Sequence, residues 1–523
     1  MDEFKMYNTL SHSVEVFKPN EEGKVKMYTC GPTVYHFVHI GNLRTYIMED
    51  ILEKSLRYIG YDVKRVMNIT DVGHLTSDAD EGEDKMVKGA KREHTTVMQI
   101  AQHYTDCFMD DIKSLNIKKP DVIEPATNCI PEFKNVISGL LKKGKAYTAG
   151  GNVYFDTSKL DNKYYVFGND MKSEDLQVGV RDDVTEDTNK HNKADFVLWF
   201  TKSKFEDQQL KWDSPWGVGY PGWHIECSCI SMKHLGEQLD IHCGGVDNIF
   251  PHHTNEVAQS EAYLGHKWCN YWFHVVHLND AEGKMSKSKG NILTVSVLKE
   301  KGFDPMDYRF FCLSSHYKKP LLFKYDLLEN SKNAYEKLVL KIAQNIKAAD
   351  ENKLNELLKA AGEIDFTDGA TFDYTVEQGK SAYTQAEDSL FSEQAVELKK
   401  AYKAAICNDI NTSDGITVIY DVLKSSISPE EKVALIADFD KVLSLNLVEN
   451  AKKKAAAEKL HDDNEDGVAD DEFTAYIKSK IAERKEAKKA KDFAKADAIR
   501  NELLEKGVEL KDTREGTVYT IKA

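Results

Sequence analysis

The chain has 523 residues, of which 41% are hydrophobic and 30% are charged, a composition that excludes a disordered or fibrous protein. Its net charge of −16 excludes non-specific binding of polyanions over the whole surface, so an RNA partner would require a local basic patch. No apolar run approaches the roughly 18–20 residues of a membrane span, and residues 1–5 lack the apolar segment of a signal peptide, so we expect a cytoplasmic protein without membrane contact.

The first region, residues 1–119, alternates predicted strand and helix. Residues 24–34 form a predicted strand, apolar positions recur at helical spacing over residues 43–59, Gly60 ends this helix, and residues 61–70 form a second strand. An opening of this strand–helix–strand kind predicts a parallel sheet that binds its ligands at the carboxyl ends of the strands.

The rest of the chain divides by composition. From residue 120 the pattern loosens into turns and short strands, residues 325–460 are nearly all helical in pattern, and residues 461–472 hold seven Asp or Glu. We predict an α/β fold with a Rossmann-type parallel sheet interrupted by an insertion, followed by an α-helical bundle and a small C-terminal domain. The predicted boundaries are 1–119 and 211–280 for the two halves of the sheet domain, 120–210 for the insertion, 281–324 for a loop region, 325–460 for the bundle, 461–472 for an acidic linker and 473–523 for the C-terminal domain.

The first candidate site lies at the start of the first predicted helix, where the chain reads His39-Ile40-Gly41-Asn42. A strand that turns into a helix through His and Gly offers free backbone N–H groups and a positive helix end to phosphates. Gly41 would let a nucleotide approach the backbone closely. Taken alone, a helix start with an incidental histidine is the better interpretation.

The second candidate site is Lys284-Met285-Ser286-Lys287-Ser288, on a predicted loop after the last predicted strand, residues 272–278. Two ammonium groups on a loop suit the negative charge that grows on a leaving pyrophosphate. A solvated lysine-rich loop explains the same residues in isolation. The order and context of this motif and the first one make the pair far more specific than either motif alone.

The third candidate site has the composition of a metal centre. If a helix begins near Pro251, His252 and Glu256 lie four residues apart on one face of it. Together with Cys30 and Cys227 they offer one imidazole, one carboxylate and two thiolates, a set that suits tetrahedral zinc.

Other interpretations of these residues stay open. The nine cysteines show no disulfide framework and are expected to be thiols or metal ligands. Cys227 and Cys229 would also fit as small buried apolar residues, and His253 or His242 would fit as the imidazole ligand in place of His252.

Together the three sites resemble the cysteinyl-tRNA synthetase family of class I aminoacyl-tRNA synthetases. The first corresponds to the HIGH signature of the family, and the second is its KMSKS signature. The resemblance runs from about residue 7 to residue 320 and continues more faintly to residues 491–497. The blocks that look specific to the family are residues 30–35, 68–71, 221–227 and 250–256.

The resemblance implies a cysteine–tRNA ligase, a monomer that activates L-cysteine with ATP and transfers it from cysteinyl-adenylate to tRNA(Cys). It also implies one zinc ion per chain that selects the substrate thiol, and Mg²⁺ that accompanies ATP. Residues 281–324 would contact the tRNA stem, and the C-terminal domain would bind the anticodon.

The resemblance further implies a role for individual residues. The implied zinc ligands are Cys30, Cys227, His252 and Glu256. The implied catalytic residues are His39, Gly41, Asn42, Lys284 and Lys287, and the implied ATP-binding residues are His39, Gly41, Gly244, Gly245, Asp247 and Lys287. The cysteine substrate would contact Gly31, Thr33, Thr70 and Trp223.

Two positions depart from the family pattern. Asn42 stands where the HIGH signature has its second histidine, and asparagine keeps a hydrogen-bond donor but cannot carry a charge. Thr254 stands where a carboxylate is usual in the metal block, which should affect the surroundings of the metal more than its coordination.

The C-terminal domain holds the candidate RNA-binding segment. Residues 478–495 contain eight Lys or Arg against three acids and include Phe493, and cations beside an aromatic ring commonly bind unstacked RNA bases. A solvated amphipathic helix is the plainer interpretation. With the resemblance, the expected tRNA contacts are Phe493, Asp497 and Asp512.

The acidic linker also begins like a calcium-binding loop at residues 462–467. Its twelfth position is Phe473, where such a loop has a bidentate glutamate, so we interpret the segment as a linker and keep a weak calcium site as the alternative.

Two other functions fit part of the sequence. A related ligase that joins cysteine to an amine of a small molecule would not need the basic C-terminal segment. A zinc-stabilised RNA-binding protein without catalysis would need neither His39 nor residues 284–288.

Overall fold

The structure is a computed structural model that describes residues 3–72, 85–93, 95–160, 166–168, 187–202, 210–280, 283–284, 292–365, 382–467, 472–489, 492–506, 508–512 and 517–521. The chain divides into two compact units, residues 1–452 and 453–523. Within the described ranges, no helix combines the length and the apolar character needed to span a bilayer.

A five-stranded parallel sheet forms the centre of the first unit, as the Rossmann-type prediction required. Its strands lie in the order β11-β10-β3-β4-β5, and all four neighbouring pairs run parallel. The chain builds outward from β3 to β4 and β5 on one side and later to β10 and β11 on the other, so the topological switch point lies between β3 and β10. The strands are β3 (Lys24–Thr29), β4 (Asp62–Ile69), β5 (Val122–Pro125), β10 (Leu239–Gly245) and β11 (Cys269–Val275).

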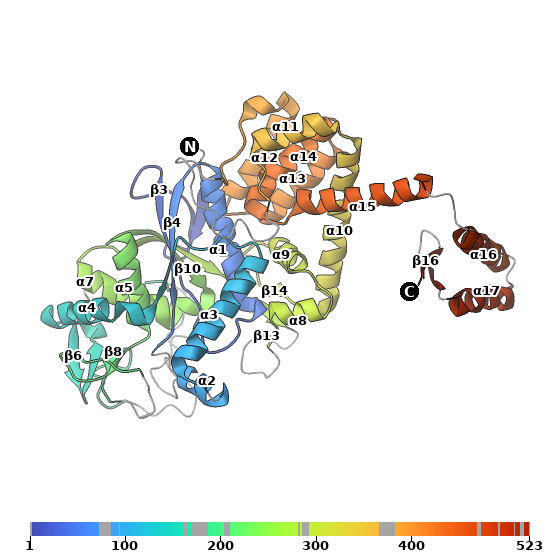
Figure 1. Cartoon of the computed structure of the whole chain (residues 1–523). Coiled ribbons are helices and arrows are strands. Elements are labelled where there is room, and N and C mark those ends of the chain that lie inside the picture. The colour runs from blue at the N-terminus through green and yellow to red at the C-terminus, as the bar shows by residue number, and fades with distance from the viewer. Residues whose placement is uncertain are drawn as a thin grey trace. The chain divides into compact units, whose positions relative to one another are not determined.

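Helices cover both faces of this sheet. Figure 1 shows α1 (Ile40–Tyr58) on one side of the strands and α5 (His224–Leu235) with α7 (Thr254–Leu264) on the other. The predicted first helix is confirmed: α1 ends at Tyr58, and Gly60 follows with a φ of +101°, a conformation that favours glycine. The predicted strand over residues 24–34 ends earlier, at Thr29, because the chain leaves the sheet there to form the site.

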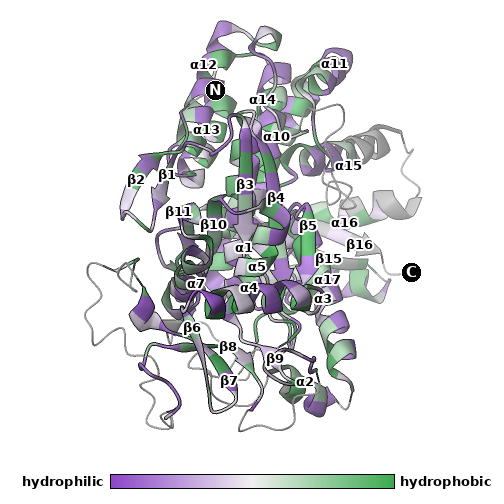
Figure 2. Ribbon diagram, turned by 90° about the vertical axis from the view of Figure 1, so that its left-hand side faces the viewer, coloured by the Kyte–Doolittle hydropathy of each residue, from purple (hydrophilic) through white to green (hydrophobic). Residues whose placement is uncertain are grey.

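The insertion is a four-stranded antiparallel sheet, and its limits differ from the predicted 120–210. β5 falls inside the predicted insertion but is the edge strand of the parallel sheet next to β4, where Figure 2 shows it as a hydrophobic segment. An edge position tolerates Pro125, the last residue of β5. The inserted strands are β6 (Ala146–Ala149), β7 (Asn152–Phe155), β8 (Phe196–Phe200) and β9 (Tyr220–Pro221), the last of them beyond residue 210.

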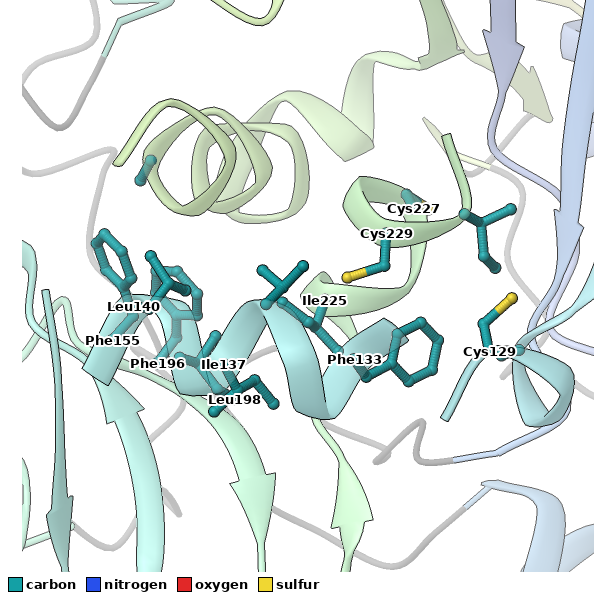
Figure 3. Packing of buried hydrophobic residues seen from close by; sticks show 14 of the residues in the cluster. Cys129, Phe133, Ile137, Leu140, Phe155, Phe196, Leu198, Ile225, Cys227 and Cys229 are labelled. Carbon is teal, nitrogen blue, oxygen red and sulfur yellow. The ribbon is translucent and has the colours of Figure 1, made fainter. Parts of the chain in front are cut away.

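The inserted sheet is joined to the main domain by a shared hydrophobic core. Figure 3 shows Phe133, Ile137 and Leu140 of α4 (Ile130–Lys142) between the antiparallel strands and α5. Cys227 on α5 belongs to the same buried cluster. The packing of α4 against α5 therefore holds the helix that carries one of the candidate metal ligands.

The remaining elements of the sheet domain lie at its edges and after it. Lys284 was expected on a loop but lies in the two-residue strand β13, which pairs with β12. The elements are β1 (Lys5–Asn8), β2 (Ser13–Val16), α2 (Lys85–Glu93), α3 (Val97–Ser114), α6 (Val246–Asn248), β12 (Leu278–Asp280), β13 (Gly283–Lys284), α8 (Val295–Glu300), α9 (Pro305–Leu313) and β14 (Leu321–Leu322), with short 3₁₀ or π turns at 126–129, 157–159, 249–253 and 388–390.

The helical bundle begins at Tyr325, as predicted. Its helices are α10 (Tyr325–Ala348), α11 (Glu351–Ala361), α12 (Glu393–Cys407), α13 (Thr412–Lys424) and α14 (Pro429–Leu443), followed by α15 (Leu447–Gly467). The predicted boundary at residue 460 falls inside α15. Residues 462–467 continue this helix, which contradicts the calcium-loop alternative for them, because a loop that wraps a cation has to leave the helix. Residues 468–471 lie outside the described residues.

The second unit has a small core of its own. It contains α16 (Glu472–Lys489), α17 (Phe493–Glu505) and an antiparallel hairpin of β15 (Val508–Asp512) and β16 (Thr517–Ile521). The buried side chains that hold it together are Ile477, Ile499, Leu503, Val508 and Leu510.

A buried ionic network fastens α1 to the sheet. The Glu53 carboxylate lies 2.8 Å from Arg57, 3.2 Å from Arg65 and 3.3 Å from Lys118, and at most 4% of each side chain is exposed. Burial raises the pKa of Glu53, but Lys118, Arg57 and Arg65 outweigh it and hold the pKa well below its usual range. The network therefore stabilises the fold above the ordinary carboxyl pKa, and its contribution is lost as the pH falls.

Replacing Glu53→Ala should lower the free energy of unfolding by about 3–5 kcal/mol, because three buried cations lose their common partner. The measurement is the main unfolding transition in urea, followed by circular dichroism. Glu397→Ala is the matched control, since Glu397 pairs with Lys400 at 2.8 Å but is 72% exposed. An equal effect of both substitutions would show that the buried network does not stabilise the fold.

Candidate metal centre and phosphate site

The candidate metal ligands meet at the switch point of the parallel sheet. Cys30 directly follows β3, and its N–H donates to the carbonyl of Cys243 in β10 at 3.3 Å. Cys227 lies in the first turn of α5, and Glu256 lies in the first turn of α7. Non-helical dihedral angles at Phe250 precede this last segment, so the helical run that carries the ligand pair begins near Pro251, as expected.

The four predicted ligands form one buried cluster, with ligand atoms that all lie within 4.8 Å of one another. The sulfur atoms of Cys30 and Cys227 are 3.8 Å apart, and Cys227 Sγ lies 3.5 Å from His252 Nε2. His252 Nε2 lies 2.9 Å from Glu256 Oε1, yet this oxygen accepts no hydrogen bond from the described residues. The two atoms are close without being aimed at each other, which is the arrangement of ligands around a common cation.

The alternative imidazoles also lie at this cluster. A second group of possible ligands consists of Cys30, His242, His253 and Glu256. His242 Nε2 lies 2.8 Å from Glu256 Oε2, and His253 Nε2 lies 3.3 Å from Cys30 Sγ. The first group has two thiols where the second has one, and it leaves His242 to hold the other oxygen of Glu256.

The charges of the cluster are set by burial and by close contact. Burial raises the pKa of Glu256, but His242 and His252 lower it to about 2. Burial lowers the pKa of His252, but Glu256 and Cys227 raise it to about 10. Burial raises the pKa of Cys227, but hydrogen bonds from Cys30 and His252 bring it to about 6. A cation that binds here replaces protons on closely packed groups, so its binding releases protons.

A second row of histidines surrounds the cluster. His253 Nδ1 lies 2.8 Å from His274 Nε2, and His274 Nδ1 lies 2.7 Å from Thr9 Oγ1. His224 Nδ1 lies 3.0 Å from His252 Nδ1. Such partners orient imidazoles that bind metals. The sequence motifs indicated only some of these histidines. A signal for the whole group was available, because five histidines are concentrated in one region of the sequence: His224, His242, His252, His253 and His274.

His39 caps the N-terminus of α1. Its Nδ1 accepts the backbone N–H of Asn42 at 3.1 Å, so the ring proton resides on Nε2 and the ring can donate from that atom. A methyl group on Gly41 would come within 2.9 Å of His39 Nδ1. The approach of a nucleotide to Gly41 stays a prediction, and the absence of a side chain there also leaves room for the His39 ring.

The predicted adenosine residues lie at the end of β10. Gly244 packs against His253, because a Cβ atom there would lie 2.8 Å from the ring. Gly245 precedes α6, and Asp247 in α6 lies 3.3 Å from His277 Nε2. Of the two predicted pyrophosphate lysines, Lys284 has a described backbone in β13, and Lys287 lies outside the described residues.

The predicted amino-acid contacts line the same edge of the sheet. Thr70 follows β4 and is buried, and Thr33 pairs with it as an isolated parallel bridge. Trp223 directly precedes α5 and stacks on His252, with ring centres 4.1 Å apart and planes 19° apart. Gly31 has no room for a side chain, because a Cβ atom would lie 1.6 Å from the carbonyl oxygen of Asn68.

The predicted tRNA contacts belong to the second unit. Asp497 is exposed on α17, whose first residue is Phe493. Asp512 ends β15. The side chains of Phe493 and Asp512 lie outside the described part of the structure.

Comparison with known proteins gives consistent matches over nearly the whole chain. A family model described as the catalytic domain of class I tRNA synthetases (C) matches residues 16–333. The chain is 42% identical to the cysteine–tRNA ligase of Treponema denticola, over 98% of this chain and 99% of that protein. It is 41% identical to the cysteine–tRNA ligase of Borreliella burgdorferi, over 98% of each chain.

Solved structures with similar folds are more distant in sequence. The Mycobacterium tuberculosis methionyl-tRNA synthetase in complex with methionyl-adenylate matches with a TM-score of 0.51 and 14% identity, over 84% of this chain and 93% of that one. A LeuRS–tRNA–LeuAMS complex from Agrobacterium radiobacter matches with a TM-score of 0.52 and 12% identity. The match covers 84% of this chain and 86% of that one. These likenesses support the α/β fold.

If the two-thiol group holds the metal, Cys30→Ala and Cys227→Ala should each remove about half or more of the sulfur-to-metal absorption of the cobalt-loaded protein, because each thiolate is one of two sulfur donors. Cys229→Ala is the control, since Cys229 is equally buried two residues further along α5 and belongs to neither ligand group. A full absorption band in either single variant would exclude that sulfur from the site.

Proposed function

The chain belongs to the cysteine–tRNA ligase family, and from this premise we propose that it selects cysteine with a zinc ion held by Cys30, Cys227, His252 and Glu256. The reaction of the family has two steps. The carboxylate of L-cysteine attacks the α-phosphate of ATP, which gives cysteinyl-adenylate and pyrophosphate. The terminal ribose of tRNA(Cys) then accepts the cysteinyl group.

The observation that carries the zinc proposal is the spacing of the buried ligand atoms. Tetrahedral zinc with sulfur ligands at about 2.3 Å and a nitrogen ligand at about 2.0–2.1 Å requires about 3.8 Å between sulfurs and about 3.5 Å between sulfur and nitrogen. The corresponding separations are 3.8 Å between Cys30 and Cys227 and 3.5 Å between Cys227 and His252. Glu256 Oε1, which lies 2.9 Å from His252 Nε2 and accepts no hydrogen bond from the described residues, would be the fourth donor.

The zinc ion supplies selectivity. Serine is nearly isosteric with cysteine, and an apolar pocket separates such analogues by only about 1–3 kcal/mol. Held by Cys30, Cys227, His252 and Glu256, a zinc ion would supply a soft Lewis acid that favours a thiol over the harder hydroxyl of serine. Trp223, stacked on His252, would then close one side of the pocket, and Thr70 would offer its hydroxyl group. An enzyme built this way needs no separate editing domain.

The chemical step needs positioned charges more than a covalent nucleophile. The N–H of Ile40 donates to Leu293 and that of Asn42 donates to His39, so we assign the positive end of the α1 helix dipole and the His39 ring to the phosphates of ATP. Lys284 and Lys287 are assigned to the leaving pyrophosphate, and Gly244, Gly245 and Asp247 to the adenosine. Asn42 takes part in the N-terminal cap of α1 through its backbone N–H, which donates to His39. The cap therefore does not depend on which side chain stands at position 42. Mg²⁺ would accompany ATP and share the phosphate charge.

The second unit is assigned to the tRNA. Its basic segment over residues 478–495 supplies phosphate contacts, and Phe493, Asp497 and Asp512 are assigned to the anticodon. The relatives named as cysteine–tRNA ligases match this unit as well, since they align over 98% of the chain. A ligase for a small-molecule amine would have no use for it. We also propose that the enzyme acts as a monomer in the cytoplasm, where its nine cysteines stay reduced.

Cysteine should drive ATP–pyrophosphate exchange at least about 10⁴-fold better than serine, because the proposed site recognises the thiol group itself and not only the size of the side chain. Removal of zinc with a chelator should abolish the exchange, and added zinc should restore it. The measurement is exchange of labelled pyrophosphate with each amino acid, before and after chelation. Equal exchange with serine, or full exchange without zinc, would contradict the zinc mechanism.

Asp497→Ala should raise the KM for tRNA about tenfold, the loss of one base contact, and leave cysteine-dependent pyrophosphate exchange unchanged. Both are measured on the full chain. Glu356→Ala, which removes an exposed carboxylate from α11 in the first unit, is the control for a general change of surface charge. If the two variants charge tRNA equally well, Asp497 does not contact the tRNA.

A further inference from the structure

A chain of buried hydrogen bonds joins the two segments that carry the thiol ligands. The N–H of Gly31 donates to Asn68 Oδ1 at 2.8 Å, and Asn68 Nδ2 donates to Thr70 Oγ1 at 3.1 Å. Thr70 Oγ1 in turn donates to Glu226 Oε2 at 2.7 Å. Asn68, Thr70 and Glu226 are each at most 2% exposed.

The ends of this chain are the residues next to the two thiols. Gly31 follows Cys30 at the end of β3, and Glu226 precedes Cys227 in α5. β3 and α5 lie about two hundred residues apart in the sequence, and the sulfur atoms they bring together are 3.8 Å apart. The bonds run through Asn68 and Thr70 at the end of β4, which lies beside β3 in the sheet.

The backbone around these residues leaves them little freedom. The Thr70 N–H donates to the carbonyl of Pro32 at 3.1 Å, and the Val34 N–H donates to the carbonyl of Thr70 at 3.2 Å. The carbonyl of Asn68 touches Gly31 so closely that no side chain fits there. Backbone hydrogen bonds therefore fix the segment after Cys30 to the end of β4. The Thr70 side chain there is hydrogen-bonded to Glu226 of α5.

Among the described residues, Thr70 is the side chain that donates to the Glu226 carboxyl group. Its Oε1 is buried and accepts no hydrogen bond from the described residues, so Thr70 is its one side-chain donor. A buried carboxyl group is costly to leave unpaired, so a change at Asn68 or Thr70 would be transmitted to the first turn of α5 and to the adjacent Cys227.

We propose that Asn68 and Glu226 are positioning residues for the metal centre. Through Thr70 they set the separation and direction of the Cys30 and Cys227 thiols. This inference rests on the proposed zinc site and deepens it. Neither residue is a ligand or touches the substrate; both act through the residues they hold.

The test is metal affinity in variants that break single links. Asn68→Asp keeps the acceptor for the Gly31 N–H but removes the donor to Thr70. Glu226→Ala removes the carboxylate that accepts the hydrogen bond from Thr70. Each should bind zinc about 10–100-fold more weakly in competition with a chromophoric chelator, as is usual when partners of metal ligands are lost. The cobalt-loaded variants should show a shifted absorption spectrum. The KM for cysteine should rise about tenfold while the KM for ATP stays within about twofold.

Conservative variants separate positioning from general damage. Glu226→Gln retains an acceptor for Thr70, and Thr70→Ser retains the hydroxyl, so both should recover most of the zinc affinity that Glu226→Ala and Thr70→Val lose. Asn116→Asp is the matched control, since Asn116 is also a buried asparagine that donates from Nδ2, but to Ser444 and Asn446 near the bundle. It should lower stability and leave zinc affinity unchanged.

The outcomes separate the two proposals. If the wild type holds zinc and Asn68→Asp binds it as tightly, or loses no more affinity than Asn116→Asp, the positioning role is overturned and the proposed function stands. If the wild-type protein holds no stoichiometric zinc, the zinc mechanism is overturned and this inference falls with it.

Discussion

The parallel pairing of β3 with β10 is the constraint on which the site depends. It places Cys30 against Cys243, and the two chain segments diverge from that point in opposite directions. Because hydrogen-bonded strands leave no gap between them, a ligand site can open only where they end, and the four candidate metal ligands lie at that edge. The packing of α5 against α4 then brings Cys227 to the same place from the other face.

The site is buried, and this decides its chemistry. Thiols, imidazoles and a carboxylate without water must satisfy one another or share a cation, since an unpaired buried charge is costly. Histidines behind the ligands contact His252, His253 and Glu256 Oε2, whereas Glu256 Oε1, 2.9 Å from His252 Nε2, accepts no hydrogen bond from the described residues. The buried Glu53 carboxylate is neutralised by protein side chains instead, because Arg57 and Arg65 carry a positive charge beside it.

Local patterns predicted what depends on neighbours in the sequence. The helix after His39, the strand that became β4 and the start of the bundle at Tyr325 follow from periodicity and from turn residues, and the structure confirms them. The true edge of the insertion and the strand at Lys284 did not follow, because each depends on a partner strand far along the chain. Asn68 and Glu226 lie in two of the family-like blocks but received no role for the same reason, because their hydrogen-bond chain has no signature in the spacing of residues.

The sequence by itself determined the family and the fold class and predicted the residues of the candidate site, because motifs and hydrophobic period are local properties. Tertiary structure alone decided which of these residues meet. It brought the two thiols to 3.8 Å and placed His242 Nε2 2.8 Å from Glu256 Oε2. The physical reason is that distance and direction between side chains are set by strand order and helix packing, which join residues that the chain keeps hundreds of positions apart.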